Sequence, residues 1–288
     1  MVLQVNELVK KYKNKTVLQN ISFFINAGEI IGLVGPNGAG KTTLMRSILA
    51  LEDIENGKIT VKDIPNTQPD FFKYVSFLPS DNYLYMHLTG YDHLSFVANI
   101  YNLGQKEINE VIDLIGMRSY VNQPVKSYSY GMRQHLFIAL SILTKPLIIL
   151  MDEPFNGLDP TSIIELKQLI RTLHSQGISI FISTHNLDIL EDLTNTIWFI
   201  KDGELFTKDI ISSIDARYEI EFSYNHSIEQ LLENIQLPFQ MNGKLLLTDP
   251  AYSMEKYLEW LLKNGAQINS VNRSKQNLED VYRYFYDV

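Results

Sequence analysis

The stretch from Gly28 to Ala50 constrains the fold of this chain more than any other part of the sequence. It begins with an apolar, β-branched run, passes through a glycine-rich loop and continues with the apolar spacing of an amphipathic helix. Strand, glycine-rich loop and helix follow one another in this order in the phosphate-binding P-loop. The loop residues are Gly35, Pro36, Asn37, Gly38, Ala39, Gly40, Lys41, Thr42 and Thr43. The sequence therefore predicts a binding site for a nucleoside triphosphate.

Each residue type in this loop has a physical reason to be there. Glycines carry no Cβ, so they allow backbone N–H groups to point at a phosphate. The helix that follows directs the positive end of its dipole to the same place. Lys41 can reach the β- and γ-phosphates, and the Thr42 hydroxyl can bind Mg²⁺. A chance match has a probability on the order of a per cent in a chain of this length, and the strand and helix on either side lower it further.

Composition limits the possible partners. The chain has 288 residues, enough for one large or two modest domains. Its formal net charge of −8 argues against nucleic acid as a partner, because such surfaces are rich in Lys and Arg. Cysteine is absent, which excludes disulfides and fits a reducing cytoplasm. No apolar run approaches the roughly 20 residues that span a bilayer. We therefore expect a protein that is soluble when isolated and reaches a membrane through a partner.

Strand and helix patterns alternate along most of the chain. Residues 2–27 are rich in strand formers, and the pattern becomes helical from about Thr89 to Leu143. Leu147–Met151 is a continuous apolar run, as expected of a strand buried on both faces of a parallel sheet. Ile178–Ser183 is a second run of this kind. The pattern predicts an α/β fold with a helical segment inserted between β-rich parts.

From about residue 215 the pattern is that of a small α+β module. Strand runs alternate there with amphipathic helices, one of them at Ile228–Asn234, and Asn242-Gly243 is a hairpin signal. Asn277 is a candidate N-cap for the last helix. No catalytic constellation is present in this part of the sequence, so we expect it to brace a dimer or to regulate the main domain.

Polar residues follow the two buried strands. Asp152 closes the first, where a P-loop enzyme holds Mg²⁺ directly or through water. Glu153 follows and can polarise a water molecule as a general base. An acidic pair after a strand is more often a helix cap, but a P-loop upstream favours the catalytic role. His185 ends the second strand, as a structural histidine or as a contact of the γ-phosphate. Tyr12 is either a surface tyrosine in a turn or a face on which adenine stacks.

The segment Ser127–Gln134 resembles the signature motif of ATP-binding cassette (ABC) ATPases, whose usual form reads Leu-Ser-Gly-Gly-Gln. The order of P-loop, signature, acidic strand, Gly157–Pro160 and His185 is also that of the family, and the resemblance covers about residues 1–210. It implies a P-loop NTPase fold with a RecA-like, mostly parallel sheet, an N-terminal antiparallel β subdomain and a helical subdomain at about 81–145. It places the ATPase domain at 1–212 and the accessory α+β domain at 213–288.

The resemblance also implies roles for individual residues. Tyr12 stacks on adenine, and His185 is the switch histidine that contacts the γ-phosphate. Gly157–Pro160, which includes Asp159, is the D-loop that runs along a dimer interface. Thr42 and Asp152 hold Mg²⁺ beside ATP, and Glu153 is the catalytic base. A second subunit contacts the same ATP through its signature residues, so that two ATP molecules join two subunits head to tail. Those signature residues are Ser129, Tyr130, Gly131 and Met132.

Two positions depart from the family pattern. Ser80 stands where the family usually has a glutamine that contacts Mg²⁺ or the attacking water and signals to the membrane partner. A serine is shorter, so we expect it to act through water. Tyr130 replaces the first signature glycine and adds a bulky side chain where the nucleotide of the partner approaches. Both changes predict altered coupling of hydrolysis, with ATP binding retained.

The resemblance favours the ATPase subunit of an ABC transporter, on the cytoplasmic face of the membrane. Such a subunit forms a homodimer or pairs with a second ABC ATPase, and it drives a separate permease. We expect the permease to contact the helical insert and the segment Ser80–Leu94. The tail Asn277–Tyr282 resembles the extension found in exporters of the bacitracin-resistance kind. The alternative is a soluble ABC ATPase that acts on a macromolecular complex, although such proteins have two cassettes or a long coiled coil.

Overall fold

A computed structural model describes most of the chain in two compact units, Met1–Phe206 and Thr207–Val288. The described residues are 1–13, 15–80, 83–207, 218–224, 235, 237–242, 245–249, 252–273 and 278–286. The expected helix at Ile228–Asn234, the Gly243 turn position, the Asn277 cap and the expected domain boundary at 212/213 lie outside these residues. Each unit is described by itself below.

The first unit begins with an antiparallel sheet in the order β2-β1-β4-β5. Its strands are β1 (Leu3–Tyr12), β2 (Lys15–Ile25), β4 (Asn56–Val61) and β5 (Ile64–Pro65). On β1, Leu3 and Val5 are fully buried on either side of the more exposed Gln4, because successive side chains of a strand point to opposite faces. A register irregularity between Val5 and Leu8 returns Leu8 to the buried face. The N-terminal β subdomain expected from the sequence is therefore present.

A second, six-stranded sheet forms the centre of this unit, in the order β10-β9-β3-β8-β7-β6. Its strands are β3 (Ile30–Val34), β6 (Val75–Leu78), β7 (Ile148–Asp152), β8 (Ser179–Ser183), β9 (Ile197–Lys201) and β10 (Glu204–Thr207). The pairs β6·β7, β7·β8, β8·β3 and β3·β9 are parallel. Every residue of β3, β7 and β8 is buried, as their continuous apolar runs predict. Because parallel strands end at the same edge, the segments after β3, β6, β7 and β8 meet there.

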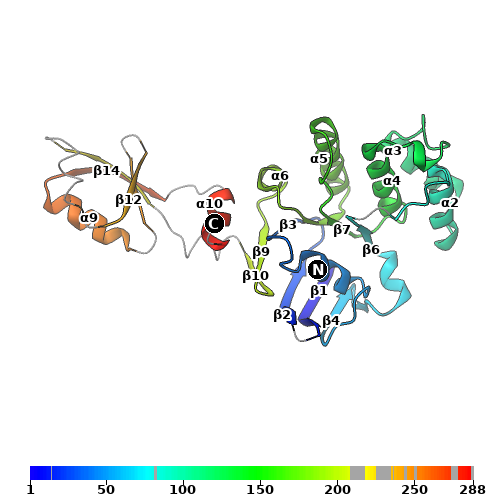
Figure 1. Ribbon diagram of the computed structural model, residues 1–288, viewed down its shortest axis with the longest axis horizontal. Coiled ribbons are helices and arrows are strands. Elements are labelled where there is room, and N and C mark those ends of the chain that lie inside the picture. The colour runs from blue at the N-terminus through cyan, green and yellow to red at the C-terminus, as the bar shows by residue number, and fades with distance from the viewer. Residues whose placement is uncertain are drawn as a thin grey trace. The chain divides into compact units, whose positions relative to one another are not determined.

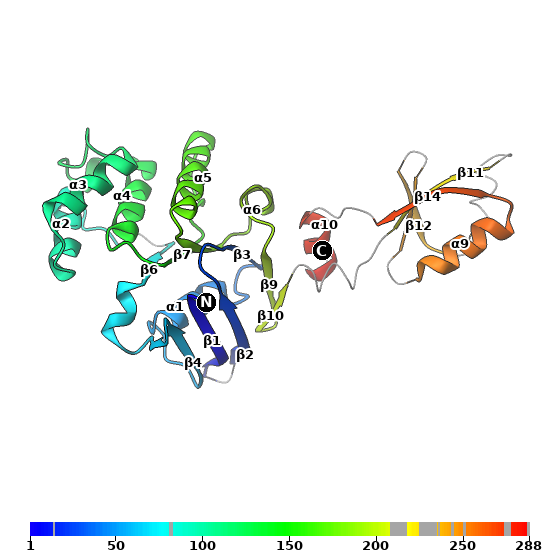
Figure 2. The same ribbon diagram turned by 180° about the vertical axis from the view of Figure 1, so that it is seen from behind.

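Alternate residues of the central strands belong to two hydrophobic cores. Ile149 and Met151 of β7 face a core shared with the helices, whereas Ile148 and Leu150 face a core shared with the antiparallel sheet and helix α1 (Lys41–Ile48). The antiparallel sheet and helix α5 (Pro160–Ser175) lie on opposite sides of the central sheet in both views (Figures 1 and 2). The central sheet is therefore covered on both faces, as doubly wound α/β folds require.

Three helices form the expected insert. They are α2 (Gly90–Ile100), α3 (Gln105–Ile115) and α4 (Tyr130–Ile142), and they lie together to one side of α5 (Figures 1 and 2). Thr89 caps α2 through a reciprocal pair of hydrogen bonds with Asp92, and Gly116 ends α3 in the left-handed conformation. The remaining short helices of the unit are η1 (Pro69–Lys73), η2 (Val125–Ser127) and α6 (Leu187–Leu193).

The second unit is α+β, as the sequence predicts. Its sheet has the order β12-β13-β11-β14, and all its pairs are antiparallel. The described elements are β11 (Tyr218–Ser223), β12 (Phe239–Asn242), β13 (Leu245–Thr248), β14 (Gln267–Arg273), α9 (Met254–Lys263) and α10 (Leu278–Tyr286). Helix α9 buries Tyr257 and Leu261 against Ile220 and Leu246 of the sheet, so the unit has a hydrophobic core of its own.

An aromatic cluster joins the antiparallel sheet to the central sheet. The ring of Phe23 on β2 lies 4.9 Å from that of Trp198 on β9 and 6.0 Å from that of Phe181 on β8, measured between centroids. We expect Phe23→Ala to lower the free energy of unfolding by about 3 kcal/mol, because the ring fills space between the two sheets. Urea denaturation followed by circular dichroism measures the change.

The neighbouring Phe24 is the matched control, since its side chain is 56% exposed on the other face of the same strand. We expect Phe24→Ala to cost less than about 1 kcal/mol. Equal losses in the two variants would show that strand propensity, and not the aromatic cluster, accounts for the effect.

Candidate nucleotide site

The glycine-rich loop joins β3 to α1 in the conformation that an anion site needs. Gly40 is the N-cap residue of α1 with a φ of 109°, and a Cβ there would lie 3.2 Å from the Leu18 side chain, so a side chain would be strained at this position. No side chain caps the helix. The first N–H groups of α1 therefore have no side-chain acceptor and face the loop, where the helix dipole favours a negative charge.

Lys41, the first residue of α1, is held inside the loop. Its Nζ donates hydrogen bonds to the carbonyl oxygens of Gly35, at 2.7 Å, and Pro36, at 3.3 Å. The same atom lies 3.5 Å from Oε1 of Glu153, and Lys41 is only 6% exposed. The loop thus concentrates one cation and a helix N-terminus at one point, which suits a polyphosphate.

Asp152, at the carboxyl end of β7, is surrounded by hydroxyl groups. It is 1% exposed, and its Oδ2 accepts hydrogen bonds from Thr42 at 2.8 Å and from Ser80 at 3.3 Å. Its Oδ1 accepts a hydrogen bond from Ser183 at 2.6 Å. Carboxylate and hydroxyl oxygens are the hard ligands that Mg²⁺ prefers, so Thr42 and Asp152 together fit this ion. Ser80 thus contacts the carboxylate of Asp152, and its expected action through water stays a prediction.

Glu153 has a backbone conformation that few residues other than glycine adopt. Its φ is 48°, and its N–H donates to Ser183 Oγ at 3.0 Å. One oxygen of its carboxylate faces Lys41, and the other lies 3.0 Å from Nδ1 of His185. Strain of this kind persists where neighbouring contacts fix the residue, and it is frequent at functional sites. The structure therefore brings Lys41, Glu153 and His185 together, as a catalytic site would require.

Ser183 belongs to the site although the sequence alone did not indicate it. This residue binds the carboxylate of Asp152 and the backbone of Glu153, and it is fully buried at the end of β8. A signal was present, since two polar residues, Ser183 and Thr184, close an otherwise apolar strand beside the acidic one. Only the pairing of β7 with β8 identifies the partner of the Ser183 hydroxyl.

Other predicted site residues belong to other elements of the first unit. Tyr12 ends β1 with a 43% exposed ring, and Nζ of Lys10 lies 4.7 Å from the ring centroid. Ser129 caps α4 by accepting a hydrogen bond from Met132 N–H at 3.2 Å, and Asp159 caps α5. Within the described residues, no hydrogen bond or ion pair joins these groups to the phosphate loop. Tyr130 and Gly131 occupy the first turn of α4 beside Ser129.

The carboxylate of Asp159 has a lowered pKa. Hydrogen bonds from the Ser162 hydroxyl and backbone hold the pKa of Asp159 below its usual value. The carboxylate also accepts a hydrogen bond from Thr161 N–H at 2.9 Å. It therefore stays charged at the positive end of the α5 dipole, which stabilises the start of this helix.

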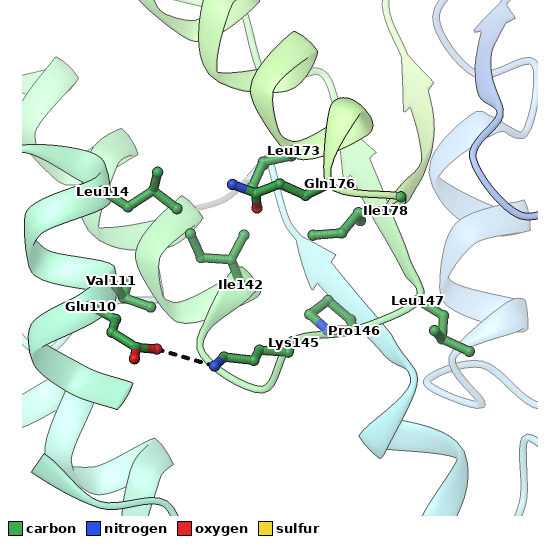
Figure 3. Close-up of a pocket in the computed structure, with 11 residues that line it drawn as sticks. Glu110, Val111, Leu114, Ile142, Lys145, Pro146, Leu147, Leu173, Gln176 and Ile178 are labelled. Atoms are coloured by element: carbon green, nitrogen blue, oxygen red, sulfur yellow. Dashed lines mark hydrogen bonds and ion pairs between the residues drawn. The ribbon is translucent and has the colours of Figure 1, made fainter. Parts of the chain in front are cut away.

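A pocket of about 500 Å³ lies at the opposite edge of the central sheet (Figure 3). Leu147 and Ile178, in its wall, directly precede β7 and β8, whereas Asp152 is at the other end of β7. Its lining is mostly apolar, and Lys145 and Glu110 form an ion pair of 3.1 Å beside it. No residue of the phosphate loop lines this pocket. The hollow is therefore separate from the candidate nucleotide site.

A family model and similar proteins both identify the family of this chain. The family model described as "ABC transporter" matches residues 18–156. A lantibiotic transport ATP-binding protein, SrtF of Streptococcus pyogenes, is 32% identical over 81% of this chain and 96% of its own length. A bacitracin transport ATP-binding protein, BcrA of Enterococcus faecalis, is 30% identical over 98% of this chain and 95% of its own length.

The fold agrees with solved structures. An ATP-binding subunit of an ABC transporter superposes with a TM-score of 0.68 and 27% identity, over 74% of this chain and 92% of that one. The predicted α/β P-loop fold is thereby confirmed.

The burial of Lys41 gives a prediction for ligand binding. We expect Lys41→Ala to weaken binding of a nucleoside triphosphate by roughly 100-fold or more, because the phosphates lose their charge-assisted hydrogen bonds. Titration with a fluorescent ATP analogue measures the affinity. Lys106→Ala is the matched control, since its side chain is 83% exposed on α3. Equal affinity in the Lys41 variant and the unmodified chain would contradict the assignment of this loop.

Proposed function

Because this chain belongs to the family of ABC transporter ATP-binding proteins, we propose that it binds and hydrolyses ATP to drive a separate membrane permease. The observation that carries the proposal is the cluster at the carboxyl edge of the central sheet. Lys41 and Asp152 are buried there beside Glu153, whose carboxylate lies between Lys41 and His185. These groups supply phosphate binding, metal binding and proton transfer in one place.

Each group has a definite task in hydrolysis. Lys41 and the N–H groups that begin α1 neutralise the phosphates. Thr42 and Asp152 would hold Mg²⁺, which when bound spreads the charge that develops on the phosphoryl oxygens. Glu153 accepts a proton from the attacking water, and His185 orients its carboxylate through the 3.0 Å contact at Nδ1. The Ser183 hydroxyl fixes the backbone of Glu153 and the carboxylate of Asp152 together.

The signature residues support a dimer. Ser129, Tyr130 and Gly131 form the exposed or half-buried start of α4, where N–H groups and the helix dipole attract an anion. They make no hydrogen bond or ion pair with the phosphate loop within the described part of their own chain. We infer that they serve the ATP bound to a second subunit, either another copy or a second ABC ATPase. Two ATP molecules would then hold the dimer closed until hydrolysis weakens it.

The helical insert carries the surface we assign to the permease. Only part of the run expected to make this contact is exposed. Tyr83 and Tyr85 are 58% and 68% exposed, whereas Leu84 is buried. Phe96 and Ile100 on α2 are 64% and 60% exposed, so large apolar groups continue along the insert. Exposed apolar groups gathered in one region are typical of interaction sites.

A groove of about 550 Å³ adjoins this surface. It lies between η1 and the end of α2, and its lining includes Phe72, Ile100 and Leu103. A short apolar segment of a permease, presented at the cytoplasmic face of the membrane, has the size and chemistry to fill it. None of the described helices combines the length and apolarity that a membrane crossing requires.

The relatives favour export. The proteins compared above are named for transport of bacitracin and of a lantibiotic, and the bacitracin relative also aligns with nearly all of this chain. We propose transport out of the cell. We further propose that the second unit is an accessory domain that braces the dimer or regulates it.

Loss of the base gives a test of the dimer. We expect Glu153→Gln to remain bound to ATP as a stable dimer, because binding survives while water is no longer activated. Size-exclusion chromatography with light scattering, with and without ATP and Mg²⁺, measures the mass. Glu259→Gln is the control, since this side chain is 71% exposed in the second unit. A Glu153→Gln protein that remains monomeric with ATP would contradict the proposed mechanism.

The permease surface is tested by two exposed tyrosines. We expect the double variant Tyr83→Ser and Tyr85→Ser to lower co-purification with the neighbouring-gene membrane protein by about tenfold, because large aromatic anchors dominate interfaces. Leu51→Ser is the control, since its side chain is 59% exposed outside the helical insert. Undiminished association of the double variant would place the permease contact elsewhere.

A further inference from the structure

The side chain of Tyr130 lies against the D-loop of its own subunit. Gly157 adopts the left-handed conformation with a φ of 75°, and a Cβ built on it would lie 3.4 Å from Cζ of Tyr130 and 3.6 Å from its hydroxyl oxygen. These are ordinary van der Waals distances, so the tyrosine ring covers the open side of this glycine. A glycine at position 130, as in the usual signature motif, would leave the turn without this contact.

Further contacts join the same two segments. A Cβ at Gly131 would lie 3.2 Å from Oγ of Ser162, and that hydroxyl donates to Asp159 at 2.6 Å. One turn along α4, the buried Gln134 amide donates to the Pro154 carbonyl at 2.9 Å. The start of the signature helix therefore lies beside Pro154, the Gly157 turn and Ser162 of α5.

The next residue of α4 adds an ionisable contact. His135 Nε2 lies 3.9 Å from Glu165 of α5, and its Nδ1 lies 3.1 Å from the Tyr120 hydroxyl. Burial lowers the pKa of His135, while the charge of Glu165 raises it. The two helices that follow the signature and the D-loop are thus also in contact beyond their first turns.

A short segment, Pro154–Asn156, connects the proposed catalytic base to the D-loop. Pro154, which Gln134 holds, is the residue after Glu153, and Asn156 N–H donates to the Glu153 carbonyl at 3.2 Å. Gly157 follows directly. A displacement of the Gly157 turn therefore reaches the strained Glu153 backbone through a few covalent bonds and one hydrogen bond.

We propose that Tyr130 is a positioning residue that couples the signature helix to Glu153 of the same subunit. This inference rests on the proposed function, in which the signature contacts ATP held by the partner. Docking of α4 on that ATP fixes Tyr130, and Tyr130 fixes the Gly157 turn and hence Glu153. Tyr130 thus lies beside one nucleotide but controls hydrolysis of the other. Each subunit cleaves its own ATP efficiently only after its signature has engaged the ATP of the partner.

Mixed dimers separate this role from a direct one. Two differently tagged full-length copies are combined, and one copy carries Glu153→Gln, so that a single site hydrolyses ATP. That site uses Glu153 of the unmodified copy and Tyr130 of the Glu153→Gln copy. Tyr130→Gly is then placed in either copy, and steady-state ATP turnover is measured for each arrangement.

We expect Tyr130→Gly to lower ATP turnover when it is placed in the copy that retains Glu153. There, kcat falls by about tenfold with KM for ATP changed less than about twofold, because a base displaced by a fraction of 1 Å slows the reaction without weakening binding. Tyr130→Gly in the Glu153→Gln copy is expected to have the smaller effect. Tyr130→Phe, which keeps the ring, restores most of the turnover lost in Tyr130→Gly. Tyr252→Gly is the control, since this tyrosine is also partly exposed and precedes a helix, in the second unit.

Hydrogen exchange of the isolated chain tests the contact itself. We expect the amides of residues 155–158 to exchange about tenfold faster in Tyr130→Gly than in Tyr130→Phe, because the turn loses its cover. Unchanged exchange at these amides overturns the proposed contact whether or not the chain hydrolyses ATP.

The kinetic outcomes are equally decisive. The inference is overturned if turnover falls more when Tyr130→Gly is in the Glu153→Gln copy, or falls equally in both arrangements. Either result leaves the proposed function standing. If the unmodified chain shows neither ATP turnover nor ATP-dependent dimerisation, the proposed function is wrong and the inference falls with it.

Discussion

The buried carboxylate of Asp152 is the interaction on which the rest of the site depends. It is 1% exposed and accepts hydrogen bonds from the hydroxyls of Thr42, Ser80 and Ser183. An ionised carboxylate is costly to bury unless it is hydrogen-bonded or paired, so these contacts are constrained to form together. The three hydroxyls come from α1, from the segment after β6 and from β8. One charge therefore fixes the phosphate loop relative to the central strands.

The charged groups of Lys41 and Glu153, beside Asp152, are held in fixed positions by the fold. Lys41 is held by loop carbonyl groups and Glu153 by the Ser183 hydroxyl, so both ends of their 3.5 Å contact are positioned by the fold. Fixed charges of this kind stabilise a transition state without reorganising during the reaction. This placement requires Glu153 to adopt a strained, left-handed backbone conformation. The adjoining D-loop, which α4 holds, determines whether that placement is kept.

The organisation of the first unit is consistent with the proposed dimer, in which each chain supplies half of a site. The phosphate loop and Asp152 lie at the carboxyl edge of the central sheet, whereas Ser129 begins a helix of the insert. A second subunit brings the missing half in the proposed dimer. The replacement of a signature glycine by Tyr130 then has a structural meaning, since its ring fills the space beside Gly157. This departure from the family pattern places an aromatic ring between the start of α4 and the Gly157 turn.

The sequence by itself determined the α/β fold, the P-loop and the buried strand that ends at Asp152 and Glu153. These features are local, since the apolar runs, the glycine spacing and the polar residues at strand ends are visible along the chain. Only the tertiary structure decided that Ser183 and Ser80 bind Asp152, that Leu84 is core while Tyr85 is exposed, and that Tyr130 covers Gly157. The physical reason is that each of these facts depends on contacts between segments far apart in the sequence, and strand pairing and packing set those contacts.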